Sequence, residues 1–165
     1  MKQMNYRMKY LFLKTFFLCF PIFFFAQTKG KVIGIKDGDT IEVLLDGNTP
    51  KVLRLAEVDC PESGQAFGKN AKSFTSSLVF GKIVTFKVTS VDRWGRSVAK
   101  VYQGKKYISE ELIKEGMGWH YHQYSNSKKL ARLQLEAKKN RIGLWQDKNP
   151  KAPWDYRKDK RKKKR

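Results

Sequence analysis

Short runs of strand-forming residues, separated by turn signals, restrict the fold of this chain more than any other feature. Two runs rich in Val, Ile and Leu, Lys31–Ile35 and Thr40–Leu45, flank the turn sequence DGD at 37–39. A second turn sequence, DGN at 46–48, leads into Lys51–Val58, where successive side chains are expected to alternate between two faces. This order predicts three antiparallel strands joined as a meander.

Helix and strand signals alternate after the meander. Four apolar residues at helical spacing predict a helix that stops near Gly81: Phe67, Ala71, Phe74 and Leu78. Two further strands are predicted at Ile83–Thr89 and Ser97–Tyr102. Two more helices are predicted at Tyr107–Glu115 and Ser127–Arg141.

Five strands with a helix after the third, and two helices at the end, predict a mainly β fold with added α-helices (α+β). The expected architecture is a five-stranded Greek-key barrel of the OB type with three helices. A twisted open sheet with helices on one side is the alternative that fits the same pattern.

The charge of the chain points to its partner. Thirty-five Lys and Arg face 15 Asp and Glu, which gives a formal net charge of +20. An excess of this size favours a polyanionic partner, most often nucleic acid and less often an anionic membrane surface. The sequence therefore predicts binding to DNA or RNA through the phosphate backbone.

The first 26 residues have the pattern of an export signal. Three basic residues, Lys2, Arg7 and Lys9, precede the mostly apolar segment 10–26, which ends at Ala26. Lys14 leaves an uninterrupted apolar stretch of 12 residues, whereas a membrane-spanning helix needs about 20. We therefore predict a cleaved signal peptide at 1–26 and an exported protein, secreted or periplasmic, with an uncleaved membrane anchor as the alternative.

The remaining chain divides into a folded body at 27–147 and a basic tail at 148–165. Residues 157–165 carry eight basic residues and one acid, and like charges this dense predict a disordered segment. The tail is either a solvated end or a non-specific arm for a phosphate backbone. Cys60 is the one cysteine after the signal peptide, so an intramolecular disulfide is excluded.

Carboxylates at two turns are candidates for a metal site. Asp39 follows the first turn, and Asp59 and Glu62 flank the Cys60-Pro61 dipeptide, where proline bends the chain. Carboxylates, a backbone carbonyl of Cys60 and water are the ligands that Ca²⁺ prefers. Asp and Gly are also common in turns without any site, so spacing alone leaves both interpretations open.

Two arginines are candidates for a phosphate clamp. Arg54 lies on the same predicted strand as Asp59, and Arg96 follows a glycine-containing turn. The planar guanidinium matches phosphate oxygens, so such a pair near carboxylates and a cation could neutralise a phosphodiester under attack. Ordinary surface arginines are the alternative.

The motifs together resemble one known family. The carrying segments are DGDT at 37–40, RLAEVDCPE at 54–62, DRWGR at 92–96 and AKKNRIGLW at 137–145. In this order and spacing they resemble the staphylococcal nuclease (thermonuclease) family and its exported bacterial members, from about Val32 to Trp145.

The resemblance implies a Ca²⁺-dependent endonuclease that cleaves DNA and RNA phosphodiesters and leaves 3′-phosphate ends. It implies Asp39, Asp59 and the Cys60 carbonyl as calcium ligands. It also implies catalytic roles for Glu62, which activates or orients the attacking water, and for Arg54 and Arg96, which clamp the phosphate.

Substrate contacts are implied for Trp94, His122 and Tyr124, although the first two differ from the prototype's residues. The protein is expected to act as a monomer. The main rival function is a catalytically inactive OB-fold protein that binds nucleic acid, although three carboxylates facing a polyanion would then have no use. A membrane-tethered basic protein is a second rival.

Overall fold

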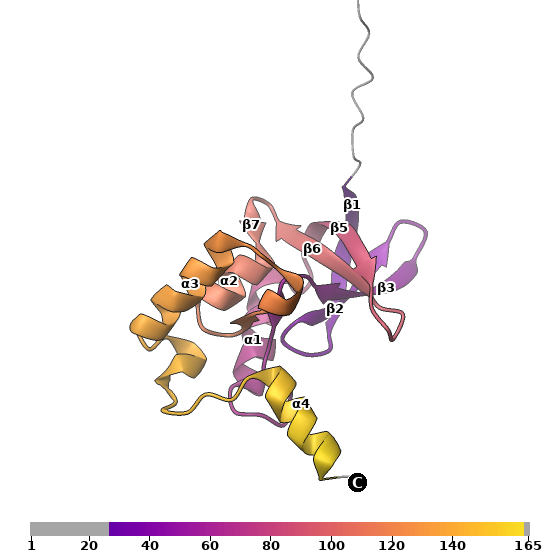
Figure 1. Ribbon diagram of the computed structural model, residues 1–165. Coiled ribbons are helices and arrows are strands. Elements are labelled where there is room, and N and C mark those ends of the chain that lie inside the picture. Colours follow the sequence, from indigo (N-terminus) through magenta and orange to yellow (C-terminus); the bar gives the residue numbers. More distant parts are fainter. Residues whose placement is uncertain (1–26, 164–165) are drawn as a thin grey trace, which may run out of the picture.

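Five strands close into a barrel in the computed structural model, which describes residues 27–163 (Figure 1). The strands of the barrel are β1 (Thr28–Ile35), β2 (Thr40–Leu45), β3 (Thr49–Leu55), β5 (Ile83–Val91) and β6 (Ser97–Gln103). Neighbouring strands pair antiparallel in the order β3-β2-β1-β5-β6. β3 then pairs in parallel with β6, with Arg54 opposite Val98, and this pairing closes the sheet on itself. The predicted OB-type α+β barrel is confirmed, and the open-sheet alternative is wrong.

Short strands and helices surround the barrel. The short strands are β4 (Val58–Asp59), β7 (Lys106–Tyr107) and β8 (Trp119–His120). The α-helices are α1 (Gly68–Val79), α2 (Ile108–Lys114), α3 (Lys128–Lys139) and α4 (Pro153–Lys162), with two 3₁₀ turns, η1 (His122–Tyr124) and η2 (Gly143–Gln146). The three predicted helices are present, and α4 is an addition to them.

The core fills the barrel and continues under α1–α3. Alternate residues of the strands point inward because successive side chains of a strand lie on opposite faces. Val32, Ile41, Leu53 and Phe86 are almost completely buried there. α3 closes over this core with Leu130, and its first turn is capped by Ser127, whose Oγ accepts a hydrogen bond from the Leu130 amide.

The predicted strand at Lys51–Val58 is divided into two. β3 ends at Leu55, and Glu57 adopts a left-handed conformation with φ 67°, which is unfavourable for a residue with a side chain. Its carboxylate compensates because it accepts hydrogen bonds from Tyr107 (2.8 Å) and Ser125 (3.0 Å) and pairs with Lys100 (3.0 Å). The chain then re-enters a sheet as β4, which pairs with β8.

The prediction of a disordered basic tail is wrong for residues 153–162, which form α4. Ala152 and Pro153 are buried at its start, and proline suits the first turn of a helix. The Tyr156 hydroxyl donates a hydrogen bond to the Gly64 carbonyl, so α4 is docked on the loop between β4 and α1 (Figure 1). Charge repulsion in the tail is offset by these contacts, which composition does not reveal.

The predicted signal peptide at 1–26 lies outside the described residues, so the structure does not test it. Across residues 27–163, the helices are all too short or too polar to cross a lipid bilayer.

We expect Glu57→Gln to make stability less dependent on pH. Burial raises the pKa of Glu57, but hydrogen bonds from Tyr107, Lys100 and Ser125 outweigh it and lower the pKa below the ordinary 4.5. A carboxylate of this kind stabilises the fold above its unfolded pKa, and the contribution is lost as pH falls through the folded value.

The variant should lose about 1–2 kcal/mol of unfolding free energy at pH 7, and much less at pH 3. Urea denaturation at the two pH values measures the difference, with the partly exposed Glu115→Gln as a charge-matched control. An equal loss at both pH values would contradict the assignment.

Candidate active site

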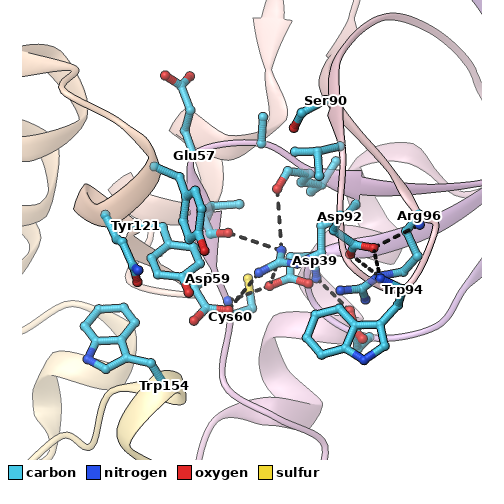
Figure 2. A pocket seen from close by; sticks show the side chains of 18 of the residues that line it. Asp39, Glu57, Asp59, Cys60, Ser90, Asp92, Trp94, Arg96, Tyr121 and Trp154 are labelled. Carbon is cyan, nitrogen blue, oxygen red and sulfur yellow. Dashed lines mark hydrogen bonds and ion pairs between the residues drawn. The ribbon is translucent and has the colours of Figure 1, made fainter. Parts of the chain in front are cut away.

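One cleft runs across the face of the barrel where β3, β4 and the β5–β6 connection meet α4. Its volume is about 1140 Å³, slightly more than the roughly 300–1,000 Å³ of a small-molecule pocket. Asp39, Arg54, Asp59, Glu62 and Arg96 all line it. Figure 2 shows several of these side chains gathered at its centre. The structure thus brings five residues from three separate segments of the chain into one place.

Asp39 and Asp59 form the buried floor of the cleft, with 6% and 1% of their surfaces exposed. Asp39 ends the tight turn at 36–39, in which its amide donates a hydrogen bond to Asp37 Oδ1. Two longer-range bonds join this turn to the next segment: the Leu55 amide donates to the Asp39 carbonyl, and the Cys60 amide donates to Asp39 Oδ2, both at 2.8 Å. The two aspartates are therefore held together by backbone groups.

Arg54 bridges the two aspartates from β3. One guanidinium nitrogen lies 2.8 Å from Asp39 Oδ2 and the other 2.8 Å from Asp59 Oδ1. The Val58 carbonyl accepts a further bond from it at 3.2 Å. These fixed partners orient the guanidinium at the floor of the cleft, beside both carboxylates.

The electrostatics of the floor favour an additional positive charge. Burial raises the pKa of Asp39 to about 6, although the Arg54 guanidinium opposes the shift. Burial also raises the pKa of Asp59 against the opposing effect of its arginine partners. Because desolvation outweighs the arginines at both residues, a cation at this point would stabilise the ionised carboxylates.

Arg96 is positioned by the turn at 92–96. Asp92 accepts hydrogen bonds from the amides of Trp94 and Arg96, each at 2.9 Å, and pairs with Arg96 Nε at 2.7 Å. These bonds outweigh burial and lower the pKa of Asp92. Arg96 also donates to Thr40 Oγ1 at 3.4 Å, and Thr40 donates in turn to Asp39. A hydrogen-bonded chain therefore links Arg96 to the floor.

The side chain of Glu62 lines the cleft near Asp59 and is partly exposed. Its Oε1 accepts a hydrogen bond from Arg157 of α4 at 2.8 Å. Arg157 also contacts both oxygens of Asp59, at 2.7 and 3.2 Å. Arg157 was not predicted from the sequence, although Pro153 signals a helix start and Trp154, Arg157 and Arg161 follow at spacings i, i+3 and i+7 on one helical face.

Aromatic side chains form one wall of the cleft. The rings of Tyr121 and Trp154 stack at 5.5 Å with an interplanar angle of 6°. Tyr124 packs edge-on against Tyr121 and is 70% exposed. Of the predicted substrate contacts, Trp94 and Tyr124 line the cleft, whereas the ring of His122 packs against Trp154, at 5.6 Å.

Trp94 stands on the opposite side of the cleft and is 65% exposed (Figure 2). The guanidinium carbons of Arg93 and Arg96 lie 4.2 and 5.2 Å from its ring centroid. Cation–π contacts at these distances help to hold the arginines in place. A flat ring open to solvent beside two arginines is also suited to stack on a base.

Cys60 does not have the properties of a nucleophile. The residue is buried, and burial raises the pKa of its thiol well above the ordinary value, so the sulfur stays protonated at neutral pH. Its backbone amide is the part that supports the site, through the bond to Asp39.

The barrel and this cleft define an OB-fold protein whose buried carboxylates and arginines meet in one cleft. Residues 52–147 match the family model described as staphylococcal nuclease homologue. The chain belongs to the staphylococcal nuclease family, as the motifs at 37–40, 54–62 and 92–96 predict.

Relatives with nuclease names support this membership. The chain is 42% identical over 127 residues to a protein of Haemophilus influenzae named an uncharacterized endonuclease. The matched region covers 77% of this chain and 71% of the relative. It is also 38% identical over 143 residues to a protein of Shigella flexneri named micrococcal nuclease. Here the matched region covers 80% of this chain and 82% of the relative.

We expect Gly68→Ala to disturb the loop that carries Glu62. A Cβ at Gly68 would lie 1.9 Å from the Glu62 carbonyl oxygen, so the loop or helix α1 has to move. Overpacking of this kind costs about 1–3 kcal/mol. Thermal unfolding should show the loss, and the exposed Ser73→Ala on the same helix should not. Unchanged stability of the Gly68 variant would show that the loop yields freely.

Proposed function

We propose that this protein is a calcium-dependent endonuclease that hydrolyses phosphodiester bonds of DNA and RNA and leaves 3′-phosphate ends. One observation carries the proposal: two buried carboxylates, bridged by Arg54, lie in the same cleft as Glu62 and Arg96. Family membership and the nuclease names of the relatives support it.

The donor groups at the floor suit a hard cation. Across residues 27–163, no three His, Cys, Asp or Glu side chains converge closely enough to form a metal site by themselves. Calcium, however, binds carboxylates together with backbone carbonyls and water. Asp39, Asp59 and the Cys60 carbonyl would hold it, and the raised pKa values of both aspartates favour a cation there. When bound, the ion supplies Lewis-acid activation of a phosphate oxygen.

The side chains around the floor of the cleft would activate the water, stabilise the phosphate and bind the bases. Glu62 accepts a proton from, or orients, a water molecule in line with the leaving 5′ oxygen. Arg54 and Arg96 offer guanidinium donors to the negative charge that develops on the phosphate. Trp94 and Tyr124, both exposed along the cleft, provide flat surfaces for bases, and His122 stays a predicted contact on the same aromatic wall.

The proposal includes an oligomeric state and a location for the protein. All groups of the proposed site come from a single chain, so a monomer suffices for activity. The pattern of residues 1–26 supports export, to the outside of the cell or the periplasm.

The calcium requirement is tested with purified protein on plasmid DNA and on RNA. We expect cleavage of both in millimolar Ca²⁺, none with a chelator, and recovery when calcium is restored. Uncut nucleic acid that nevertheless shifts on a gel would overturn the proposal in favour of an inactive nucleic-acid-binding protein.

The role of Glu62 is tested with Glu62→Gln. Loss of a general base typically slows catalysis by about 10²–10⁴-fold, and we expect a decrease in kcat in that range with unchanged thermal stability. Glu115→Gln is the matched control, because Glu115 is partly exposed like Glu62 but lies outside the cleft lining. A kcat within threefold of the wild-type value would remove Glu62 from the mechanism.

A further inference from the structure

Helix α4 places a cation of its own on the carboxylates of the cleft. Arg157 donates to Asp59 Oδ2 at 2.7 Å, to Asp59 Oδ1 at 3.2 Å and to Glu62 Oε1 at 2.8 Å. Asp59 Oδ1 also accepts from Arg54 at 2.8 Å. Both oxygens of this buried carboxylate are therefore engaged by arginine, and Arg157 supplies the contact to Oδ2.

This placement follows from the docking of α4 rather than from chance contact of a basic tail. Trp154 lies among three aromatic rings, those of Trp119, Tyr121 and His122, at 5.5–5.6 Å. Tyr156 is hydrogen-bonded to the Gly64 carbonyl. Trp154 and Arg157 are three residues apart and so lie on the same side of the helix. Figure 2 shows Trp154 on the side of the cleft where Asp59 and Tyr121 lie.

We propose that Arg157 and the calcium ion compete for the Asp59 carboxylate, so that α4 sets the affinity of the metal centre. The proposal rests on the metal-binding role of Asp59 in the proposed function. A guanidinium that is hydrogen-bonded to the lone pairs of Asp59 keeps those lone pairs from binding a metal ion. A calcium ion on the same carboxylate would also repel the positive charge of the guanidinium.

The exchange requires only a movement of the Arg157 side chain. Its side chain is 33% exposed, while Ala152, Trp154 and Tyr156 dock α4 through separate contacts. When calcium takes Asp59, Arg157 retains Glu62 as a partner on the edge of the cleft. α4 can therefore stay docked in both arrangements, and the barrel need not change.

Calcium titration by isothermal calorimetry of the purified full chain tests this inference. We expect Arg157→Gln to bind calcium about tenfold more tightly than the wild type, because removing its charge-assisted contacts frees Asp59 Oδ2 and leaves only Arg54 on Oδ1. Arg157→Lys keeps the charge but cannot span both carboxylates as a fork, so its affinity should lie between the two.

Arg161→Gln is the matched control. Arg161 lines the same cleft one turn further along α4, so its loss changes net charge equally without touching Asp59. Its calcium affinity should change by less than about twofold, in line with weak screened interactions at an exposed site. Thermal unfolding and far-UV circular dichroism verify that each variant keeps the fold.

Three outcomes would overturn the inference. Arg157→Gln with equal or weaker calcium binding shows that Arg157 does not compete. An equal gain in Arg161→Gln shows a general charge effect. In both cases the proposed metal site still stands if the wild type binds calcium and Asp39→Asn does not. No calcium binding by the wild type or by Arg157→Gln refutes both the inference and the proposed metal site.

Discussion

The parallel pairing of β3 with β6 is the constraint on which the site depends. It closes the barrel and places Arg54 opposite Val98, two residues after Arg96. The two arginines therefore lie on neighbouring chain segments of the same cleft, although 42 positions separate them in the sequence. The antiparallel pairing of β2 with β3, in which Thr40 lies opposite Arg54, brings the turn at 36–39 against the end of β3, where the Leu55 amide bonds to the Asp39 carbonyl.

Burial of charge is the main energetic cost of this arrangement. Asp39 and Asp59 lie almost without solvent, and their raised pKa values show that their partners do not fully offset desolvation. Arg54 and Arg157 recover part of the cost with short, charge-assisted bonds. The buried apolar core of the barrel offsets the remaining cost.

The sequence predicted the barrel because its signals are local. Apolar runs bounded by DGD and DGN turns indicate strands whatever surrounds them, and β2 and the start of β5 and β6 agree with the predicted bounds. The misplaced end of β3 has a non-local cause: the left-handed Glu57 is stabilised by Tyr107 and Ser125, which lie 50 and 68 positions away. No window of sequence around residue 57 contains that information.

The candidate site, like the fold, could be predicted from the sequence only in part. The sequence by itself determined the residue types and their order: two aspartates at turns, Glu62 after a proline bend, and two arginines in motifs that identify the family. Only the tertiary structure decided that α4 folds and that Arg157 reaches Asp59 and Glu62. The physical reason is that the charge density of the tail disfavours order locally, whereas aromatic packing of Trp154 and two carboxylates nearly 100 positions away stabilise it.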